Sequence, residues 1–260
     1  MLKGKTALVT GSTSGIGLGV ALCLAKEGAN IVLNGFGDTA GPQAQVATAG
    51  KAHDIKVGYH GADMSKAADI ESMMSFAAAE FGGVDILVNN AGIQHVAPVE
   101  DFPPERWDAI IAINLSSAFH TTRLAIPSMR TKNWGRVINI ASTHGLVASA
   151  QKSAYVAAKH GIVGFTKAIA LETATTGITV NAICPGWVLT PLVQKQIDDR
   201  AARKGIPLEK AKRDLLAEKQ PSLQFTSPEQ LGALTLFLCS AAAENVRGQA
   251  WAVDGGWTAQ

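Results

Sequence analysis

The chain contains 260 residues, 47% of them hydrophobic and 17% charged, with a formal net charge of +2. This composition predicts a globular protein with a sizeable core, and the scattered charges form no basic stretch for nucleic acid. No segment reaches membrane-spanning length and no signal-peptide pattern precedes Thr6–Thr10, so we expect a cytoplasmic protein without a membrane partner. The three cysteines are widely spaced, which predicts reduced thiols. The six histidines lack the spacing of metal ligands, so we expect no metal site.

Short apolar runs, typical of strands buried on both faces, recur along the chain. They are Thr6–Thr10, Ile31–Asn34, Ile55–Tyr59, Val84–Asn89, Arg136–Ile140, Ile178–Ile183 and Gln249–Val253. Apolar residues three and four positions apart predict intervening helices, the clearest being Gly15–Glu27, Lys66–Phe81, Ser153–Thr173 and Pro228–Cys239. This alternation predicts an α/β fold: a single doubly wound, Rossmann-type domain over residues 1–260, with a seven-stranded parallel sheet and helices on both faces.

The segment Thr190–Gln224 departs from this alternation. It is rich in charge and contains Gly205, Pro207 and Pro221, which predicts two short helices separated at residues 205–207. The segment is either a solvated surface excursion or a lid that closes over a substrate. Because it follows the sixth strand on the ligand side of the sheet, we expect a small helical lid over residues 190–224.

The first strand runs into the sequence Gly-Ser-Thr-Ser-Gly-Ile-Gly, residues 11–17, at the start of a predicted helix. Glycine at positions 11, 15 and 17 lets the backbone turn sharply and approach a phosphate closely. The free N–H groups at the beginning of the helix would then face that phosphate. A strand, a glycine-rich turn and a helix in this order predict a dinucleotide site.

Tyr155 and Lys159 are four residues apart in a predicted helix, so their side chains lie on one face. A lysine cation beside a tyrosine favours the phenolate, and we expect Lys159 to lower the pKa of Tyr155 toward the range of a general base. Ser142 ends the fifth strand, and Asn114 lies inside a long helical stretch. These four side chains are the candidate catalytic group.

The order and spacing of Asn114, Ser142, Tyr155 and Lys159, together with the glycine loop and Asn-Asn-Ala-Gly at residues 89–92, resemble the short-chain dehydrogenase/reductase family. The resemblance implies an enzyme that transfers a hydride between a nicotinamide cofactor and an alcohol or ketone. It implies that Tyr155 is the acid/base, that Ser142 holds the substrate oxygen and that Lys159 also binds the nicotinamide ribose. Asn114 would anchor a proton-carrying water, bond the backbone in a helix break, or do both.

The same resemblance implies a set of cofactor-binding residues. They are Gly11, Thr13, Gly15, Ile16, Gly17, Phe36, Asp63, Asn90, Gly92, Tyr155, Lys159, Pro185, Val188 and Thr190. It also places Asn89 and Gly92 near the adenosine and nicotinamide sides. Two alternatives stay open: Asn90 either contacts the cofactor or braces the strand end, and Asp63 either accepts from the adenine amino group or caps a helix that begins near Ser65.

The choice between NAD and NADP depends on the end of the second strand. NADP requires a cation near the ribose 2′-phosphate, and neither the glycine loop nor Leu33–Asp38 contains lysine or arginine. We therefore predict NAD as the cofactor. Asp38 lies slightly late for the acid that takes the ribose hydroxyls in NAD-dependent relatives.

Four polar residues are expected around the substrate: Gln94, His144, Lys152 and Gln196. One cation, one imidazole and two amides around a small volume would bind a carboxylate, although Lys152 alone could equally be a surface residue. With Ser142 and Tyr155 they predict a small hydroxy acid or keto acid as the substrate. Trp187 would cover the apolar side of a short chain, or simply pack beneath the lid.

Two other functions stay open. A 3-oxoacyl or acetoacetyl thioester reductase of the same family would normally use NADPH and would need room for a long carrier. A dinucleotide-sensing binding protein without activity would be expected to lack Tyr155 or Lys159, and both are present.

The sequence also predicts a homotetramer. The expected helices Pro104–Met129 and Ser153–Thr173 are apolar on more than one face, so the sheet can cover them only in part. The last strand carries Trp251 and is followed by Trp257, which gives a second apolar edge. Two self-complementary surfaces of this kind generate a tetramer with D₂ symmetry.

Overall fold

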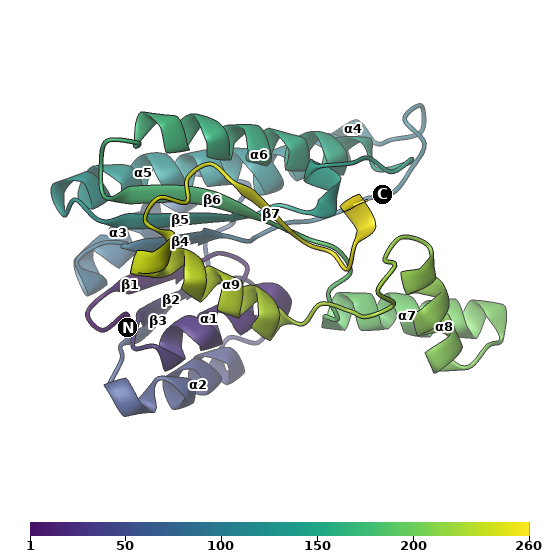
Figure 1. Cartoon of the computed structure of the whole chain (residues 1–260), viewed down its shortest axis with the longest axis horizontal. Helices are drawn as coiled ribbons and strands as arrows, with labels where there is room; N and C mark the ends of the chain where they lie inside the picture. Colours follow the sequence, from purple (N-terminus) through teal and green to yellow (C-terminus); the bar gives the residue numbers. More distant parts are fainter. Residues whose placement is uncertain (260) are drawn as a thin grey trace.

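The computed structural model describes residues 1–259 and contains one parallel sheet of seven strands between two layers of helices (Figure 1). The strands are β1 (Thr6–Val9), β2 (Asn30–Asn34), β3 (Val57–His60), β4 (Ile86–Asn89), β5 (Gly135–Ile140), β6 (Ile178–Pro185) and β7 (Ala250–Val253). Their order across the sheet is β3-β2-β1-β4-β5-β6-β7, so the direction of winding reverses between β1 and β4. The predicted doubly wound fold is confirmed, and every strand end lies within two residues of its predicted position.

Helices cover both faces of the sheet (Figure 1). One layer comprises α1 (Gly15–Lys26), α2 (Ala40–Ala49) and α9 (Pro228–Cys239), and the other comprises α3 (Ala67–Phe81), α5 (Ser117–Thr131) and α6 (Ser153–Glu172). Each layer buries its own apolar cluster against the sheet, centred on Leu24 and Leu231 in the first and on Met73 and Met129 in the second. Within residues 1–259, no helix combines the length and apolarity needed to cross a bilayer.

The helix expected over Pro104–Met129 is not continuous. A short helix, α4 (Pro104–Ile111), passes into a π-helical turn over Ala112–Ser116, and α5 continues from Ser117. Both flanking helices keep apolar residues at helical spacing, so the periodicity gives no sign of the change. Single π turns inside α-helices occur frequently at functional sites, and this one contains Asn114.

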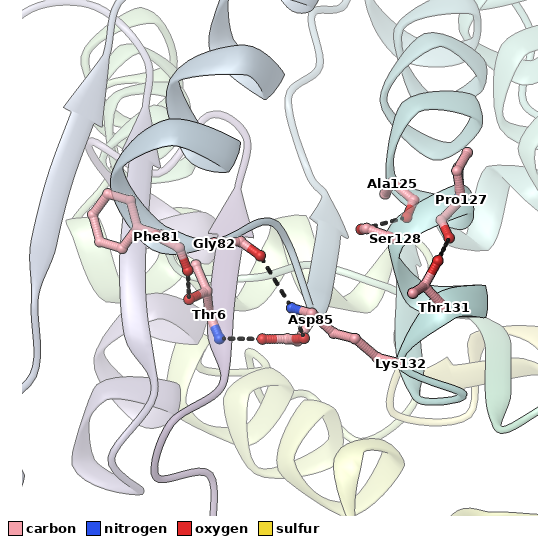
Figure 2. A network of polar contacts seen from close by, with 9 residues as sticks. All are labelled: Thr6, Phe81, Gly82, Asp85, Ala125, Pro127, Ser128, Thr131 and Lys132. Carbon is pink, nitrogen blue, oxygen red and sulfur yellow. Dashed lines mark hydrogen bonds and ion pairs between the residues drawn. The ribbon is translucent and has the colours of Figure 1, made fainter.

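The carboxylate of Asp85, buried just before β4, fixes the amino edge of the sheet (Figure 2). One of its oxygens accepts from the Thr6 N–H at 2.9 Å, and the other accepts from Lys132 Nζ at 2.8 Å. Lys132 also donates to the Gly82 carbonyl at 3.2 Å. One carboxylate therefore ties together the start of β1, the loop before β4 and the residue that follows α5.

Between β6 and α9 the chain leaves the sheet as a pair of helices, α7 (Pro191–Lys204) and α8 (Leu208–Ala217), which project at the carboxyl edge (Figure 1). The pair has a small apolar core of its own, which includes Ile197 and Leu215. The two predicted helices are present, and they are separated at residues 205–207 as expected. Gly205 ends α7 in a left-handed conformation with a φ of 59°, which favours glycine.

Both roots of this helical pair are tied to the body of the protein. Val188, before α7, forms a parallel bridge with Thr226, after α8. The Thr226 N–H donates to the Trp187 carbonyl at 2.9 Å, and the Trp187 N–H donates to Gln220 Oε1 at 2.9 Å. Trp187 is therefore held at the base of the helical pair, and it also packs against the apolar core of α7 and α8.

Candidate active site

Two adjoining cavities open where β1, β4, β5 and β6 end, beside α1 and α6. Their volumes are about 340 Å³ and 190 Å³. Gln94, Ser142 and Tyr155 line both of them. A reaction at the Tyr155 hydroxyl could therefore involve one molecule in each cavity.

The larger cavity begins at the glycine loop between β1 and α1. Gly11 and Gly15 have φ angles of 62° and 56°, which L side chains rarely adopt. A Cβ atom at Gly11 would lie 2.9 Å from Ala91 Cα, and one at Gly17 would lie 2.4 Å from the Gly11 carbonyl oxygen. The loop therefore requires glycine, and it brings the free N–H groups at the start of α1 to the cavity. Such a cradle fits the pyrophosphate of a dinucleotide.

Most of the expected cofactor residues line this larger cavity. They are Gly11, Gly15, Ile16, Asn90, Gly92, Tyr155, Lys159, Pro185 and Thr190. Val188 lines the smaller cavity instead. The remaining members, Thr13, Gly17, Phe36 and Asp63, line neither cavity. Gly17 packs under the glycine loop, and Thr13 Oγ1 donates to the Phe36 carbonyl at 3.0 Å.

Asn89 and Asn90 face different surroundings at the end of β4. Asn90 lines the larger cavity, and its Nδ2 donates to the Thr10 and Gly11 carbonyls at 2.8 Å and 2.9 Å. It therefore braces the glycine loop, as the structural alternative held. Asn89 is buried, bonds Asn139 and does not line the larger cavity, because alternate residues of a strand point to opposite faces. Its place near the adenosine stays a prediction.

Asp63 caps a turn and not a helix. Its Oδ1 accepts from the N–H and the hydroxyl of Ser65, at 2.9 Å and 2.7 Å, and these hydrogen bonds lower the pKa of the carboxyl. The following helix, α3, begins at Ala67 with Lys66 at its N-cap position. The expected helix cap is therefore wrong, because the chain makes a further turn before the helix starts.

The end of β2 is held by neutral contacts. Asn34 is buried, and its Nδ2 donates to the His60 and Ala62 carbonyls at 3.0 Å each. Asp38 Oδ1 accepts from the Gly41 N–H at 3.1 Å, so this carboxylate is engaged with α2. The Phe36 side chain is 67% exposed. The loop thus presents an exposed aromatic side chain where the resemblance expects the adenosine ribose.

Tyr155 and Lys159 both belong to α6 and lie beside the end of β5. Lys159 Nζ donates to the Ile140 carbonyl at 2.7 Å and lies 5.6 Å from the centroid of the Tyr155 ring. Burial lowers the pKa of Lys159 to about 8. Burial raises the pKa of Tyr155, and a hydrogen bond with Ser142 opposes this rise. The pKa of Tyr155 is therefore raised and not lowered as expected, because desolvation disfavours the phenolate and Lys159 is not among the groups that shift it.

Asn114 lies in the π-helical turn, and both polar atoms of its side-chain amide form hydrogen bonds with the backbone of Ile93. Its Oδ1 accepts from the Ile93 N–H and its Nδ2 donates to the Ile93 carbonyl, both at 2.9 Å. This pairing fixes the segment between Gly92 and Gln94, which lines both cavities at Gln94. The expected role in a helix break therefore agrees with the contacts that Asn114 makes.

The smaller cavity collects every expected substrate residue. They are Gln94, Ser142, His144, Lys152, Tyr155, Trp187 and Gln196. Lys152 is not a surface lysine: burial and, secondly, repulsion from Lys219 lower its pKa. Its Nζ lies 6.0 Å from the centroid of the Trp187 ring. A partly desolvated cation beside two amides and an aromatic wall can bind a small carboxylate with a short apolar chain.

Trp257 also lines the smaller cavity, and the sequence did not indicate it as a substrate residue. Its ring packs edge-on against His144, with the centroids 5.4 Å apart. The Asp254 carboxylate accepts from the Gly256 and Thr258 N–H groups and so turns the chain back over the cavity. An aromatic residue directly after Asp-Gly-Gly was the available signal, because such a turn can direct the following side chain inward. The expected exposed edge at Trp257 is wrong for the same reason.

A parallel sheet with a glycine loop at its switch point, and a Ser-Tyr-Lys group beside it, defines a nicotinamide-dependent oxidoreductase of the short-chain type. The family model described as short chain dehydrogenase matches residues 5–201. The chain belongs to this family.

Within this family, the chain is similar to proteins of known name. The chain is 73% identical over 260 residues to D-beta-hydroxybutyrate dehydrogenase of Cupriavidus necator, covering 100% of both chains. It is 56% identical to the protein of the same name from Rhizobium meliloti, covering 98% of this chain and 99% of the other. Among solved structures, L-sorbose reductase from Gluconobacter frateurii, complexed with NADPH and L-sorbose, superposes with a TM-score of 0.92 at 31% identity, covering 100% and 98% of the two chains.

Proposed function

We propose that this oxidoreductase interconverts D-3-hydroxybutyrate and acetoacetate, with NAD as the hydride acceptor or donor. The observation that carries the proposal is a half-buried lysine, Lys152, in a cavity of about 190 Å³ that is also lined by the Tyr155 side chain. A carboxylate held by Lys152 would leave the rest of a four-carbon chain within reach of Tyr155. The name and the 73% identity of the Cupriavidus necator protein support the same substrate.

In this proposal the larger cavity holds NAD and the smaller cavity holds the substrate. NAD in the larger cavity would supply hydride acceptance from the substrate carbon, and its cationic nicotinamide ring would favour the tyrosinate form. During oxidation the Tyr155 oxygen takes the proton of the substrate hydroxyl, and during reduction it returns that proton. Ser142 donates to the substrate oxygen, and Lys159 holds positive charge close to Tyr155 in either direction. Asn114 keeps the Gly92–Gln94 wall in place and would anchor a water for the released proton.

Substrate selection follows from the walls of the smaller cavity. Lys152, Gln94 and Gln196 provide one charge and two amides for the carboxylate, while Trp187 and Trp257 enclose the methyl end. Gln196 belongs to α7, so the helical pair over residues 190–224 completes the cavity and would act as its lid. A long thioester carrier would have to displace Lys152 and both tryptophans, which disfavours the thioester reductase.

Three features of the β2 end support NAD over NADP. Phe36 is exposed, Asn34 is committed to backbone carbonyls, and Asp38 repels rather than attracts a phosphate. No lysine or arginine lies between residues 30 and 50. A 2′-phosphate would therefore lack a cationic partner from this loop.

We also propose that the protein is a homotetramer. Phe119 on α5 and Leu171 on α6 are 49% and 79% exposed in the single chain. Phe237 on α9 packs against Trp251 on the edge strand β7, with ring centroids 6.0 Å apart, and is itself partly exposed. These two apolar surfaces would each be covered by a symmetry-related copy.

The proposed activity is tested by the absorbance of NADH formed from NAD and D-3-hydroxybutyrate. NADP and the L enantiomer serve as matched controls. We expect turnover only with NAD and the D enantiomer. NADH formation that is equal for both enantiomers would contradict the substrate, and NADP use with a thioester would favour the reductase. Cofactor binding without turnover of any hydroxy acid would favour a non-catalytic sensor.

A further inference from the structure

Both ring nitrogens of His144 are engaged by serine hydroxyls. Nδ1 lies 3.3 Å from Ser142 Oγ, and Nε2 lies 3.0 Å from Ser149 Oγ. The ring also packs edge-on against Tyr155, with the centroids 5.8 Å apart. Ser149, His144 and Ser142 therefore form one hydrogen-bonded chain that runs from the loop after β5 to the reacting tyrosine.

The loop that carries Ser149 is fixed on its other side. The Gln151 carbonyl accepts from the Ala97 N–H at 3.0 Å, which ties this loop to the segment that follows β4. Ser149 itself is half-buried. The backbone two residues after Ser149 is therefore anchored, which limits the movement of the loop beside His144.

The hydrogen bonds of Ser142 depend on the protonation of His144. A serine hydroxyl has one proton and two acceptor positions, and the His144 backbone N–H fills one of these at 3.1 Å. If Nδ1 carries the ring proton, it fills the second, and the hydroxyl proton is left for the substrate oxygen. If Nε2 carries the ring proton, Ser142 must instead donate to Nδ1, and the substrate oxygen loses that donor.

We propose that Ser149 is a positioning residue whose hydroxyl donates to His144 Nε2, holds the imidazole in its Nδ1–H form and so directs the Ser142 proton to the substrate oxygen. The inference rests on the proposed role of Ser142. Burial, with Lys152 and Lys219 nearby, lowers the pKa of His144 to about 4, so near pH 7 the ring carries a single proton. His144 then serves the reaction through Ser142, in place of the direct carboxylate contact that the sequence pattern predicts.

Two amide substitutions distinguish these roles. In His144→Asn the side-chain nitrogen can replace Nδ1, whereas in His144→Gln it can replace Nε2. If His144 acts through Ser142, His144→Asn retains kcat at least about tenfold better than His144→Gln, the size of one lost hydrogen bond. Retention of kcat by His144→Gln, with a raised KM in His144→Asn, would mean a direct carboxylate contact and would overturn the proposal.

Substitution of Ser149 tests the outer end of the chain. We expect Ser149→Ala to lower kcat about tenfold with little change in KM, and Ser149→Thr to restore it because the hydroxyl returns. Ser72→Ala is a matched control, since Ser72 Oγ makes a similar contact of 3.2 Å with His60 Nε2, away from both cavities. A Ser149→Ala enzyme with the kcat of the wild type would refute the positioning role.

Nitrogen-15 chemical shifts of the His144 ring provide a readout that does not depend on the substrate. We expect a protonated Nδ1 in the wild-type protein and a shift toward the Nε2–H form in Ser149→Ala. A protonated Nε2 in the wild type would overturn the inference even if D-3-hydroxybutyrate is turned over. A protonated Nδ1 would sustain the inference even if a different hydroxy acid proves to be the substrate, so the two proposals fail separately.

Discussion

Lys159 lies close to Tyr155 without a direct hydrogen bond to it. The lysine nitrogen is 5.6 Å from the centre of the tyrosine ring and donates to the Ile140 carbonyl. The strand β5 therefore anchors the cation, and α6 sets its distance from the phenol. Because burial raises the pKa of Tyr155, the free protein holds this side chain as a neutral phenol at pH 7. The tyrosinate needed for alcohol oxidation would have to be favoured by additional positive charge in the site.

Replacing Tyr155 tests the acid–base assignment. Tyr155→Phe keeps the ring that packs against His144 but removes the proton acceptor, so we expect kcat to fall at least about a hundredfold. The affinity for NAD, measured by fluorescence titration, should change little. Turnover close to that of the wild type would contradict the mechanism.

Replacing Lys152 tests the carboxylate pocket. Lys152→Ala should raise KM for D-3-hydroxybutyrate by about tenfold or more, since a charge-assisted hydrogen bond is lost, while NAD affinity stays constant. Lys212→Ala, which changes a lysine paired with Glu209 on α8, is the control and should leave KM unchanged. Unchanged KM in both variants would mean that Lys152 does not contact the substrate.

The pH dependence of the same pocket follows from the lowered pKa of Lys152. The cation is present below this pKa and is lost above it, so the affinity for a carboxylate falls as pH rises. As pH is raised, we expect the decline of kcat/KM for D-3-hydroxybutyrate to start at a pH lower than 10.5, the ordinary lysine value. Lys152→Ala should lack this component of the profile, and an identical alkaline decline in both proteins would assign it to another group.

Phe36 is the position at which cofactor preference should be changeable. Its side chain is exposed, and its backbone is held by Thr13, so Phe36→Arg can place a guanidinium beside the ribose without disturbing the loop. We expect kcat/KM for NADP to rise at least about tenfold. Phe36→Leu is the control and should leave it unchanged. Strong NADP use by the wild-type protein would contradict the proposed preference for NAD.

The proposed tetramer is tested by sedimentation at micromolar concentration. We expect the wild type to have four times the chain mass of 27.1 kDa, and Phe119→Glu to dissociate into dimers because one of the two apolar surfaces is lost. Leu208→Glu, at an exposed apolar residue on α8, should keep the tetramer. A single wild-type species of monomer mass would refute the assembly.

The elements of the fold were predictable because their signals are local. Apolar runs give the strands, and Gly205 and Pro207 give the break between α7 and α8. The π-helical turn around Asn114 was not predictable, since the apolar spacing continues through it on both sides. Local pattern therefore defines where elements begin and end, but not a single inserted residue inside a helix.

The sequence predicted which residues line the site better than it predicted the contacts between them. The six other substrate residues predicted with Lys152 line the same cavity, because the carboxyl ends of parallel strands converge. The pairing of His144 with Ser149 depends on how the loop after β5 folds back, and the position of Trp257 depends on the turn at Asp254. Loop conformation of this kind is set by long-range contacts that no short pattern records.

The hydrogen bond between Trp187 and Gln220 couples two properties of the enzyme. Trp187 is held by Gln220 and by the Thr226 pairing, at the root of the helical pair and not on α7 or α8. Because Trp187 also packs against the apolar core of α7 and α8, a movement of α7 that takes Gln196 from the substrate would also shift this aromatic wall. Changes in the apolar core of α7 and α8 would then alter both the rate of product escape, and hence kcat, and the size of acid that is accepted.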